Sequence, residues 1–349
     1  MTQEYVLGKL LTKAFDQRTP LVGSLEINTT CNFNCIHCYL MGKHDLIMQY
    51  PDVIRILDEM KRVGTLFLNL TGGEIFAHPE FERIYSYAVS KGFIVSLLTN
   101  ASMLTPQIRN LLKAKPPRKI EITIYGISQE VFKKVTCSDS NPDMILENIV
   151  SLKEDGHNIL LKMMTLKENQ LEFNLVKVFA DKYTIPFQYD ISLLPTLSGD
   201  QKVLQHQLSV DEAIALELSD GTNRLARWKS MVESYDVAQN KKINCGCGKF
   251  SYAISADMQL KRCNFIAGGS DAFSLKQYSF NEIWNKWNME KPNLFSYEHC
   301  KKCMYQALCD VCPSVSYTLG SEKDGRVQRQ CDLAKARYEV VKRYEDSCN

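Results

Sequence analysis

Between residues 22 and 192 the chain alternates two hydrophobic patterns. Short apolar runs rich in β-branched residues indicate buried strands, and the segments between them carry apolar residues at helical spacing. Several helical segments have proline at a first-turn position, where its missing N–H costs nothing. The pattern predicts strands at 22–28, 65–71, 93–99, 119–125, 158–164 and 185–191, and helices at 51–63, 79–91, 106–114, 142–154 and 171–183.

This alternation is typical of repeated βα units around a parallel sheet. Six units of this length suit a partial TIM-like barrel of the α/β class, a (β/α)6 fold, better than a closed eight-stranded barrel. In barrels of this kind the chemistry lies at the carboxyl ends of the strands. We therefore expect functional residues directly after each strand.

The pattern changes after residue 192, where a polar loop leads into helical segments that end near residue 240. The later elements are short: a β-hairpin at 250–263, a helix around 280–287 and a final helix from about Asp332. Metal clusters are expected to stabilise this part, which has little apolar patterning. The predicted regions are an N-terminal extension (1–20), the barrel (21–200), a helical bridge (201–240), a small cysteine-rich domain (241–335) and a C-terminal helix (336–349).

Composition excludes several classes of function. The 349 residues are 45% hydrophobic, which is ample for a core, and they carry a net charge of only +2. Charges are well mixed along the chain, so nucleic acid and anionic membrane surfaces are not expected partners. No apolar run approaches a membrane span, and the first twenty residues lack a signal peptide. We expect a cytoplasmic protein.

Thirteen cysteines without an export signal favour metal ligation over disulfides. Cys31, Cys35 and Cys38 follow directly on the first predicted strand. A structural zinc site uses four ligands, whereas a [4Fe–4S] cluster held by three cysteines leaves one iron open for a ligand. The alternative is a zinc loop completed by His37 or His44.

A second set of cysteines lies in the last third of the chain. Its eight thiols could ligate two further [4Fe–4S] clusters completely. Paired Cys-x2-Cys is also a zinc spacing, so zinc-ribbon-like knuckles are the alternative. The set consists of Cys245, Cys247, Cys263, Cys300, Cys303, Cys309, Cys312 and Cys331.

The string CNFNCIHCY at 31–39 resembles the signature of radical S-adenosylmethionine (SAM) enzymes. In that family the open iron chelates the amino and carboxylate groups of SAM. One electron then cleaves SAM to methionine and a 5′-deoxyadenosyl radical, which abstracts a substrate hydrogen. The resemblance implies a one-electron donor such as flavodoxin or ferredoxin.

Further motifs of that family follow in the expected order. Thr71-Gly72-Gly73-Glu74, after the second strand, resembles the GGE motif, whose glycines let the backbone approach the methionine part of SAM and whose glutamate binds its ammonium. The turns after the third and fourth strands are also similar, although their polar residues could equally satisfy backbone groups. The implied SAM-binding residues are Tyr39, Gly72, Gly73, Glu74, Thr99, Asn100 and Thr123.

The later cysteines resemble the SPASM extension of peptide-modifying radical SAM enzymes. Two departures are visible: Met258 replaces a turn glycine, and Cys309 and Cys312 are separated by two residues instead of three. The resemblance implies three [4Fe–4S] clusters in total. One auxiliary cluster would use Cys245, Cys247, Cys263 and Cys312, and the other would use Cys300, Cys303, Cys309 and Cys331.

Residues 189–214 look like the matching stretch of enzymes that mature ribosomally made peptides. The implied reaction forms a thioether or carbon–carbon crosslink, or oxidises a side chain. About twenty residues precede the first strand, which is too few for a leader-binding domain. Either a separate recognition protein brings the peptide, or the barrel mouth and the SPASM face bind it directly.

Three residues are candidates for the chemical steps after hydrogen abstraction. Asp190 could be a general base, or a cap for local backbone amides. Tyr125 could act at the barrel mouth or pack there. Cys137 could donate hydrogen, as a peptide epimerase requires, or be an ordinary free thiol. The alternatives to a crosslinking or oxidising enzyme are an anaerobic sulfatase maturase, which makes formylglycine, a peptide epimerase, and a non-enzymatic zinc-stabilised binding protein.

Overall fold

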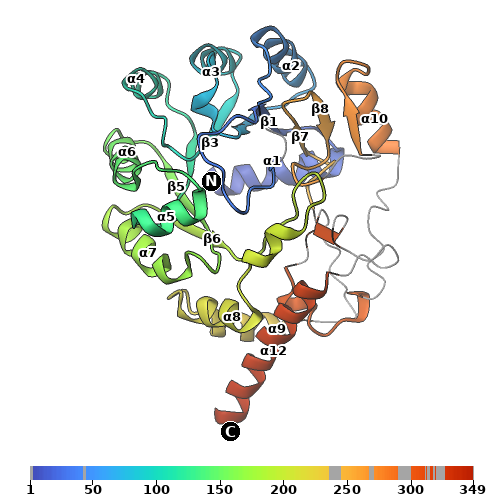
Figure 1. Cartoon of the computed structure of the whole chain (residues 1–349). Coiled ribbons are helices and arrows are strands. Elements are labelled where there is room, and N and C mark those ends of the chain that lie inside the picture. The colour runs from blue at the N-terminus through green and yellow to red at the C-terminus, as the bar shows by residue number, and fades with distance from the viewer. Residues whose placement is uncertain are drawn as a thin grey trace. The chain divides into compact units, whose positions relative to one another are not determined.

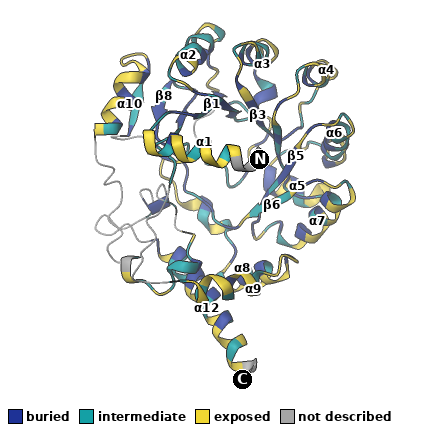
Figure 2. Cartoon of the chain, turned by 180° about the vertical axis from the view of Figure 1, so that it is seen from behind, coloured by how far each residue is buried: buried dark blue, intermediate teal, exposed yellow. Residues whose placement is uncertain are grey.

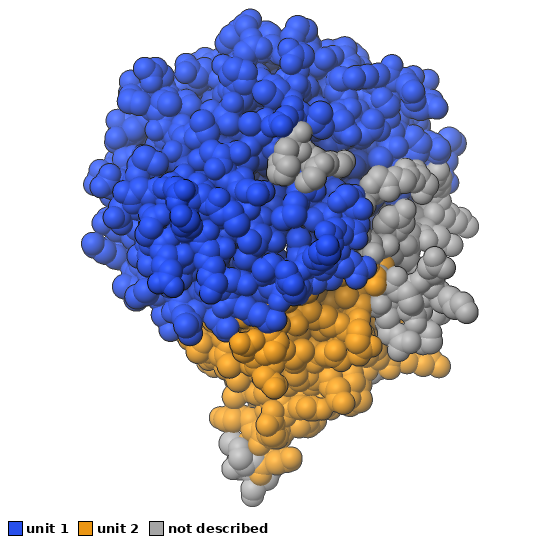
Figure 3. All heavy atoms as spheres, in the orientation of Figure 1, with its two compact units in different colours: residues 1–206, 246–291 blue, residues 207–245, 292–349 orange. Residues whose placement is uncertain are grey.

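The computed structural model describes residues 3–41, 45–235, 245–266, 271–289, 300–310, 312, 315, 316, 319 and 327–348. These residues fall into two compact units, coloured in Figure 3. The first comprises residues 1–206 and 246–291, and the second comprises residues 207–245 and 292–349. The predicted hairpin at 250–263 therefore belongs to the same unit as the barrel. The sequence pattern placed it in the cysteine-rich domain (241–335).

The first unit is built on one nine-stranded sheet in the order β6-β5-β4-β3-β2-β1-β7-β8-β9. Strands β1 to β6 run parallel and form the predicted partial barrel (Figure 1). Strands β1, β3 and β5 are drawn largely in the colour of buried residues in Figure 2. Leu25, Ile27 and Leu70 are fully buried. The six strands are β1 (Val22–Asn28), β2 (Phe67–Gly72), β3 (Ile94–Thr99), β4 (Lys119–Thr123), β5 (Ile159–Met164) and β6 (Phe187–Asp190).

Helices cover the outer face of the sheet, and the five predicted ones are confirmed within two residues at each end. They are α2 (Tyr50–Arg62), α3 (Phe81–Ser90), α4 (Pro106–Ala114), α6 (Pro142–Glu154) and α7 (Phe173–Lys182), accompanied by the short 3-10 turns η1 (Ile75–Ala77) and η2 (Gln170–Glu172). Helix α5 (Gln129–Thr136) was not predicted. It is only eight residues long, so its pattern covers barely two turns.

The predicted hairpin is confirmed as β7 (Ser251–Ile254) and β8 (Gln259–Lys261), with β9 (Ala272–Ser274) beside it. The pairing of this hairpin with the barrel was not predicted. Strand β7 lies parallel to β1, with Ser251 opposite Val22. Met258 takes the turn glycine's place with a φ of +63°, a left-handed conformation that disfavours most side chains. Helix α10 (Phe280–Met289) follows in the same unit.

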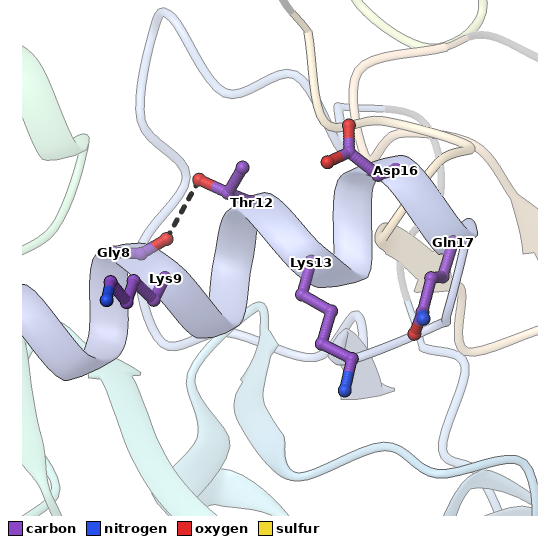
Figure 4. Close-up of a pocket in the computed structure, with 6 residues that line it drawn as sticks. All are labelled: Gly8, Lys9, Thr12, Lys13, Asp16 and Gln17. Atoms are coloured by element: carbon purple, nitrogen blue, oxygen red, sulfur yellow. Dashed lines mark hydrogen bonds between the residues drawn. The ribbon is translucent and has the colours of Figure 1, made fainter.

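Helix α1 (Gln3–Gln17), also unpredicted, covers the amino ends of the strands. Its Ala14 packs with Leu21 and Phe67, which precede or begin β1 and β2. The opposite face of α1 carries a groove of about 660 Å³ (Figure 4). This groove lies at the amino ends, away from the carboxyl ends where barrel chemistry is expected.

The second unit contains α8 (Val210–Ser219), α9 (Arg224–Glu233) and α12 (Gln328–Cys348), which begins four residues before the predicted start. Its described turns are η5 (Cys300–Lys302) and η6 (Gln306–Leu308), while η3 (Lys202–His206) ends the first unit's barrel segment. Ile214, Trp228, Leu308 and Val341 form its core. Across the described residues of both units, no helix combines the length and the apolar character needed to cross a membrane.

Candidate active site

The cysteine triplet lies on the loop after β1, and the end of α5 holds this loop. The backbone N–H groups of Asn34 and Ile36 donate to the carbonyls of Thr136 and Val135, with N–O distances of 2.9 and 3.0 Å. These bonds use carbonyls of the last turn of α5, which lack partners within a helix. The unpredicted helix therefore positions the predicted ligands.

The three thiols are close enough to influence one another's ionisation. Burial, with smaller contributions from the neighbouring Glu74 and Cys38, raises the pKa of Cys31 to about 11. Burial also raises the pKa of Cys35 and of Cys38. Iron binds the thiolate form, so the positive charge of a cluster would compensate the burial of three anionic sulfurs. The donor set thus fits a three-cysteine cluster.

Each of these sulfurs accepts hydrogen bonds. Cys31 Sγ lies 3.4 Å from the backbone N of Phe33 and 3.7 Å from Asn100 Nδ2. The Cys35 thiol is hydrogen-bonded to the Tyr125 side chain. Backbone hydrogen bonds from residues 40 and 41 lower the pKa of the Cys38 thiol and so oppose the effect of its burial. Such bonds orient metal ligands and tune the metal.

A zinc loop completed by histidine was the alternative for this triplet. Among the described residues, no three His, Cys, Asp or Glu side chains are grouped around a position for a single metal ion. His44 lies outside the described residues. The His37 ring packs 5.4 Å from the Tyr125 ring, measured between centroids. Its Nδ1 is buried without a hydrogen-bond partner in the described part of the chain.

Gly72 and Gly73 lie directly against the triplet loop. A Cβ on Gly72 would be 2.3 Å from the Asn28 carbonyl oxygen, and one on Gly73 would be 2.3 Å from that of Thr30. The close approach permits hydrogen bonds from Gly73 N to Asn28 O at 3.0 Å and from Glu74 N to Thr30 O at 2.9 Å. The glycines are therefore required for joining the first two strand ends, in addition to any approach to SAM.

The Glu74 side chain is fully buried and bonded to protein donors. Its Oε1 accepts from Thr99 Oγ1 at 2.6 Å and from the backbone N of Phe76 at 3.0 Å. Its Oε2 accepts from the backbone N of Asn100 at 2.7 Å. Burial raises the Glu74 pKa, while these hydrogen bonds oppose the shift. Glu74 thus joins the ends of β2 and β3, and its contact with SAM stays a prediction.

Tyr39 links the triplet loop to two other segments. Its hydroxyl donates to Glu26 Oε1 at 3.2 Å, and its ring lies 5.6 Å from the Phe265 ring, which follows the hairpin. Its carbonyl accepts from the backbone N of Leu197 at 2.8 Å. Burial raises the pKa of Glu26, and the nearby Lys261 opposes this shift.

The predicted residues Thr123, Cys137 and Asp190 each lie at the end of a different strand or helix. Thr123 ends β4 and is half-buried. Cys137 is exposed and ends α5 in the left-handed region with a φ of +50°. Asp190 ends β6, and its Oδ1 accepts from the backbone N of Ser192 at 2.8 Å. This is the capping contact that was the alternative to a role as base.

Sequence reasoning missed a histidine–carboxylate pair formed by Glu168, which follows β5, and His206, which follows β6. His206 Nδ1 lies 2.7 Å from Glu168 Oε1, and Glu168 Oε2 is buried without a hydrogen-bond partner among the described residues. The pair lies near the triplet loop: His37 has a pKa lowered to about 4, chiefly by burial and then by His206, while Glu168 opposes the shift. The sequence signal was weak, because Glu168 follows a strand end and His206 lies in a polar loop.

The eight later cysteines are divided between the two units. Cys247 and Cys263 belong to the first unit, and the other six belong to the second. The thiols of all eight are half-buried. Cys300 and Cys303 share one turn, in which Cys303 N donates to Cys300 O at 3.1 Å. The ligand sets implied by the SPASM resemblance stay a prediction.

Residues 25–175 match the model of the radical SAM superfamily. The antilisterial bacteriocin subtilosin biosynthesis protein AlbA of Bacillus subtilis is 23% identical over 84% of this chain and 67% of its own length. The mycofactocin maturase MftC of Mycobacterium tuberculosis is 25% identical over 88% of this chain and 81% of its own. These relatives align with most of the chain, beyond the matched domain.

Among solved structures, Streptococcus suis SuiB bound to its precursor peptide SuiA has a similar fold. The TM-score is 0.69 with 13% identity, and the match covers 91% of this chain and 77% of SuiB. The matched residues include the triplet loop and strands β2 to β5 of the barrel. The chain therefore carries a radical SAM domain at residues 25–175.

Proposed function

We propose that this enzyme modifies a ribosomally made peptide, either by forming a thioether or carbon–carbon crosslink or by oxidising a side chain. The observation that carries the proposal is the triplet loop, which presents one buried and two half-buried cysteines after a strand's carboxyl end and is bonded to the last turn of α5. AlbA and MftC, named as a bacteriocin biosynthesis protein and a maturase, support a peptide substrate. So does the fold shared with peptide-bound SuiB.

Cys31, Cys35 and Cys38 would hold a [4Fe–4S] cluster beside SAM. When bound, this pair supplies the radical that removes a substrate hydrogen. The chain retains polar atoms for such a ligand on the same loop: Asn28 Oδ1 and Thr30 Oγ1 are buried without hydrogen-bond partners among the described residues. Unsatisfied buried polar atoms are unfavourable in a protein alone. A polar ligand at this loop would satisfy them.

Oxidation of a substrate radical requires a proton acceptor and an electron acceptor. For the proton, the proposal assigns His206, which the 2.7 Å contact with Glu168 orients. A carboxylate bonded to one imidazole nitrogen orients the ring and fixes its tautomer. Asp190 is the less favoured base, because its carboxylate caps Ser192. For the electron, the proposal assigns two auxiliary [4Fe–4S] clusters on the eight later cysteines.

The proposal also includes protein partners and a cellular location. A flavodoxin-like or ferredoxin-like donor would supply electrons, and a separate protein could bring the leader of the peptide. The reaction would take place in the cytoplasm, where thiols stay reduced. The exposed groove on α1 is not assigned to the substrate, because it lies at the amino ends of the strands.

The test uses the full chain, purified and reconstituted without oxygen. It is incubated with SAM, a reductant and the short peptides encoded beside its gene, and the products are analysed by mass spectrometry. We expect 5′-deoxyadenosine together with a peptide that has lost two hydrogens, or about two daltons. A variant with Cys31, Cys35 and Cys38 all replaced by alanine should yield neither. Uncleaved SAM in the wild-type reaction would contradict the proposal.

Two alternative reactions have different products. A sulfatase maturase would convert a cysteine or serine in a sulfatase-motif peptide to an aldehyde, which hydrazide labelling detects. A peptide epimerase would leave the mass unchanged in ordinary water and would introduce one deuterium from heavy water. Cys137 would be the hydrogen donor in that case, and its exposed thiol at the end of α5 is compatible with this role. Cys137→Ser should then abolish deuterium incorporation.

A further inference from the structure

Two side chains from neighbouring strand ends donate hydrogen bonds to sulfurs of the triplet. Asn100 follows β3, and its Nδ2 lies 3.7 Å from Cys31 Sγ. Tyr125 follows β4, its ring lies beside those of Phe33 and His37 on either side of Cys35, and its side chain forms a hydrogen bond with the Cys35 thiol. Cys38 differs, because its donors are backbone N–H groups of its own loop. Two of the three sulfurs thus depend on side chains outside the loop.

The orientation of the Asn100 amide is fixed by its oxygen. Oδ1 accepts from the backbone N of Ser102 at 2.9 Å and from its Oγ at 2.5 Å. Because the oxygen must face these donors, the NH2 group faces the opposite way. It reaches Cys31 Sγ and, at 3.4 Å, Asn32 Oδ1. A reversed amide would lose both oxygen contacts.

The Tyr125 ring is fixed on several sides. Its centroid lies 6.3 Å from that of Phe33, in an edge-to-face arrangement, and 5.4 Å from that of His37. The Tyr125 carbonyl accepts from Asn169 Nδ2 at 3.0 Å. These contacts use the ring and the backbone, whereas the hydroxyl is directed to the Cys35 sulfur.

Hydrogen bonds to cluster sulfurs affect reduction because the reduced cluster is the more negative state. A donor stabilises that state more than the oxidised one and therefore raises the reduction potential. We propose that Asn100 and Tyr125 are positioning residues that set the potential of the triplet's cluster through their bonds to Cys31 and Cys35. The inference rests on the cluster of the proposed function, but it requires no peptide.

This assignment differs from what the sequence implied for both residues. The resemblance gave Asn100 a role in SAM binding, and Tyr125 was a candidate for chemistry at the barrel mouth. In the structure their polar groups contact thiols that the cluster would use. A donor that acts on the cluster should change its potential even when no substrate is present.

The test is a redox titration of the reconstituted full chain, followed by electron paramagnetic resonance. The signal of the triplet's cluster is identified as the one that SAM alters. Poised at the wild-type midpoint, Tyr125→Phe should lower the ratio of reduced to oxidised cluster by about threefold to tenfold, tenfold being 59 mV for one electron. Asn100→Ala should act in the same direction, and the double variant should multiply the two factors, because they act on different sulfurs.

Two control variants make matched changes away from the sulfurs. Tyr87→Phe removes a hydroxyl that donates to Asp58 at 2.9 Å. Asn148→Ala removes an amide that donates to the Ala101 carbonyl at 2.9 Å, in the turn that contains Asn100. Both should titrate at the wild-type potential. A shift in Asn148→Ala equal to that in Asn100→Ala would mean that the turn matters and the donor does not, which overturns the role of Asn100.

The proposal is overturned if Tyr125→Phe and Asn100→Ala hold wild-type amounts of iron and titrate at the wild-type potential. If one variant binds no iron, the other decides by the same criterion. Iron–sulfur stretching frequencies, measured by resonance Raman spectroscopy, give a second readout, and each variant should shift them. Failure of the peptide assay would leave these titrations unchanged, so the two proposals fail separately.

Discussion

At the scale of single residues, Glu74 illustrates how a motif can serve the fold as well as a ligand. Sequence reasoning identified Gly72, Gly73 and Glu74 and expected all three to face SAM. Their contacts also join three strand ends, since the glycines adjoin Asn28 and Thr30 while the carboxylate binds the turn after β3. The motif could be predicted from spacing, but its contacts could not, because they depend on partners in other loops.

The first prediction concerns the hydroxyl that donates to Glu74. Thr99→Val keeps the shape of the side chain and leaves Glu74 Oε1 without its 2.6 Å partner. Losing a hydrogen bond to a buried carboxylate should lower the free energy of unfolding by about 2 kcal/mol. Urea denaturation of the cluster-free chain measures this change.

The matched control is Thr12→Val, which removes an exposed hydroxyl that donates to the Gly8 carbonyl at 3.0 Å. Exposed substitutions of this kind usually change stability by less than about 0.5 kcal/mol. Equal effects of the two variants would contradict the assigned role of Thr99.

The second prediction separates the two candidate bases. His206→Gln preserves a polar side chain but removes the proton acceptor, so the substrate radical should form without being oxidised. The yield of modified peptide per 5′-deoxyadenosine should then fall by about 10²-fold or more, the usual contribution of a general base. Asp190→Asn retains the oxygen that caps Ser192 and should keep the wild-type yield. The reverse pattern would assign the base to Asp190.

At the scale of elements, helices with a long run of apolar residues at helical spacing were predicted more accurately than short ones. The helices at 106–114 and 142–154 were predicted to the residue, because proline marks the start of each and apolar spacing continues for two turns or more. Helix α5 was missed because it is short, and α1 because its apolar stripe was not expected to cover the strands. The consequence is functional, since α5 holds the triplet loop.

The third prediction tests this support. Ser128 caps α5, and its side chain and backbone N both bind the Glu172 carboxylate. Ser128→Ala should destabilise the helix by about 1 kcal/mol. Because the carbonyls of Val135 and Thr136 hold the loop, we also expect the reconstituted variant to lose iron faster to a chelator. The control is Ser209→Ala at the cap of α8, in the other unit, where iron loss should stay at the wild-type rate.

The fourth prediction concerns acid stability. Arg109 and then Lys113 hold the pKa of Asp155 well below its usual range, which tethers the end of α6 to α4. A carboxylate with a depressed folded pKa stabilises the fold above its unfolded pKa of about 3.9, and this contribution is lost as the pH falls further.

Asp155→Asn should therefore destabilise the chain at neutral pH and flatten the fall in stability below about pH 4. Thermal unfolding as a function of pH measures both effects. Asp139, an exposed partner of Lys133, provides the control, and Asp139→Asn should leave the profile unchanged. A variant Asp155→Asn with the wild-type profile would contradict the tether.

At the scale of the whole molecule, the sequence of predicted strands and helices was enough to predict the six-stranded barrel. It did not predict that β7 would pair with the first strand, β1. Six parallel strands in sequence order follow from βα alternation. The parallel pairing of β7 with β1 could not be predicted, because more than two hundred residues separate the strands and no local pattern specifies a partner. Cysteine spacing identified the triplet but not the side chains that bind its sulfurs.

The central claim is that the triplet holds a cluster with one iron open to SAM. The most direct measurement is electron paramagnetic resonance of the reduced, reconstituted chain with and without SAM. We predict that SAM changes one cluster signal in the wild type, and that this signal is absent when Cys31, Cys35 and Cys38 are replaced by alanine. A spectrum that SAM leaves unchanged, or a signal that survives loss of all three cysteines, would contradict the account.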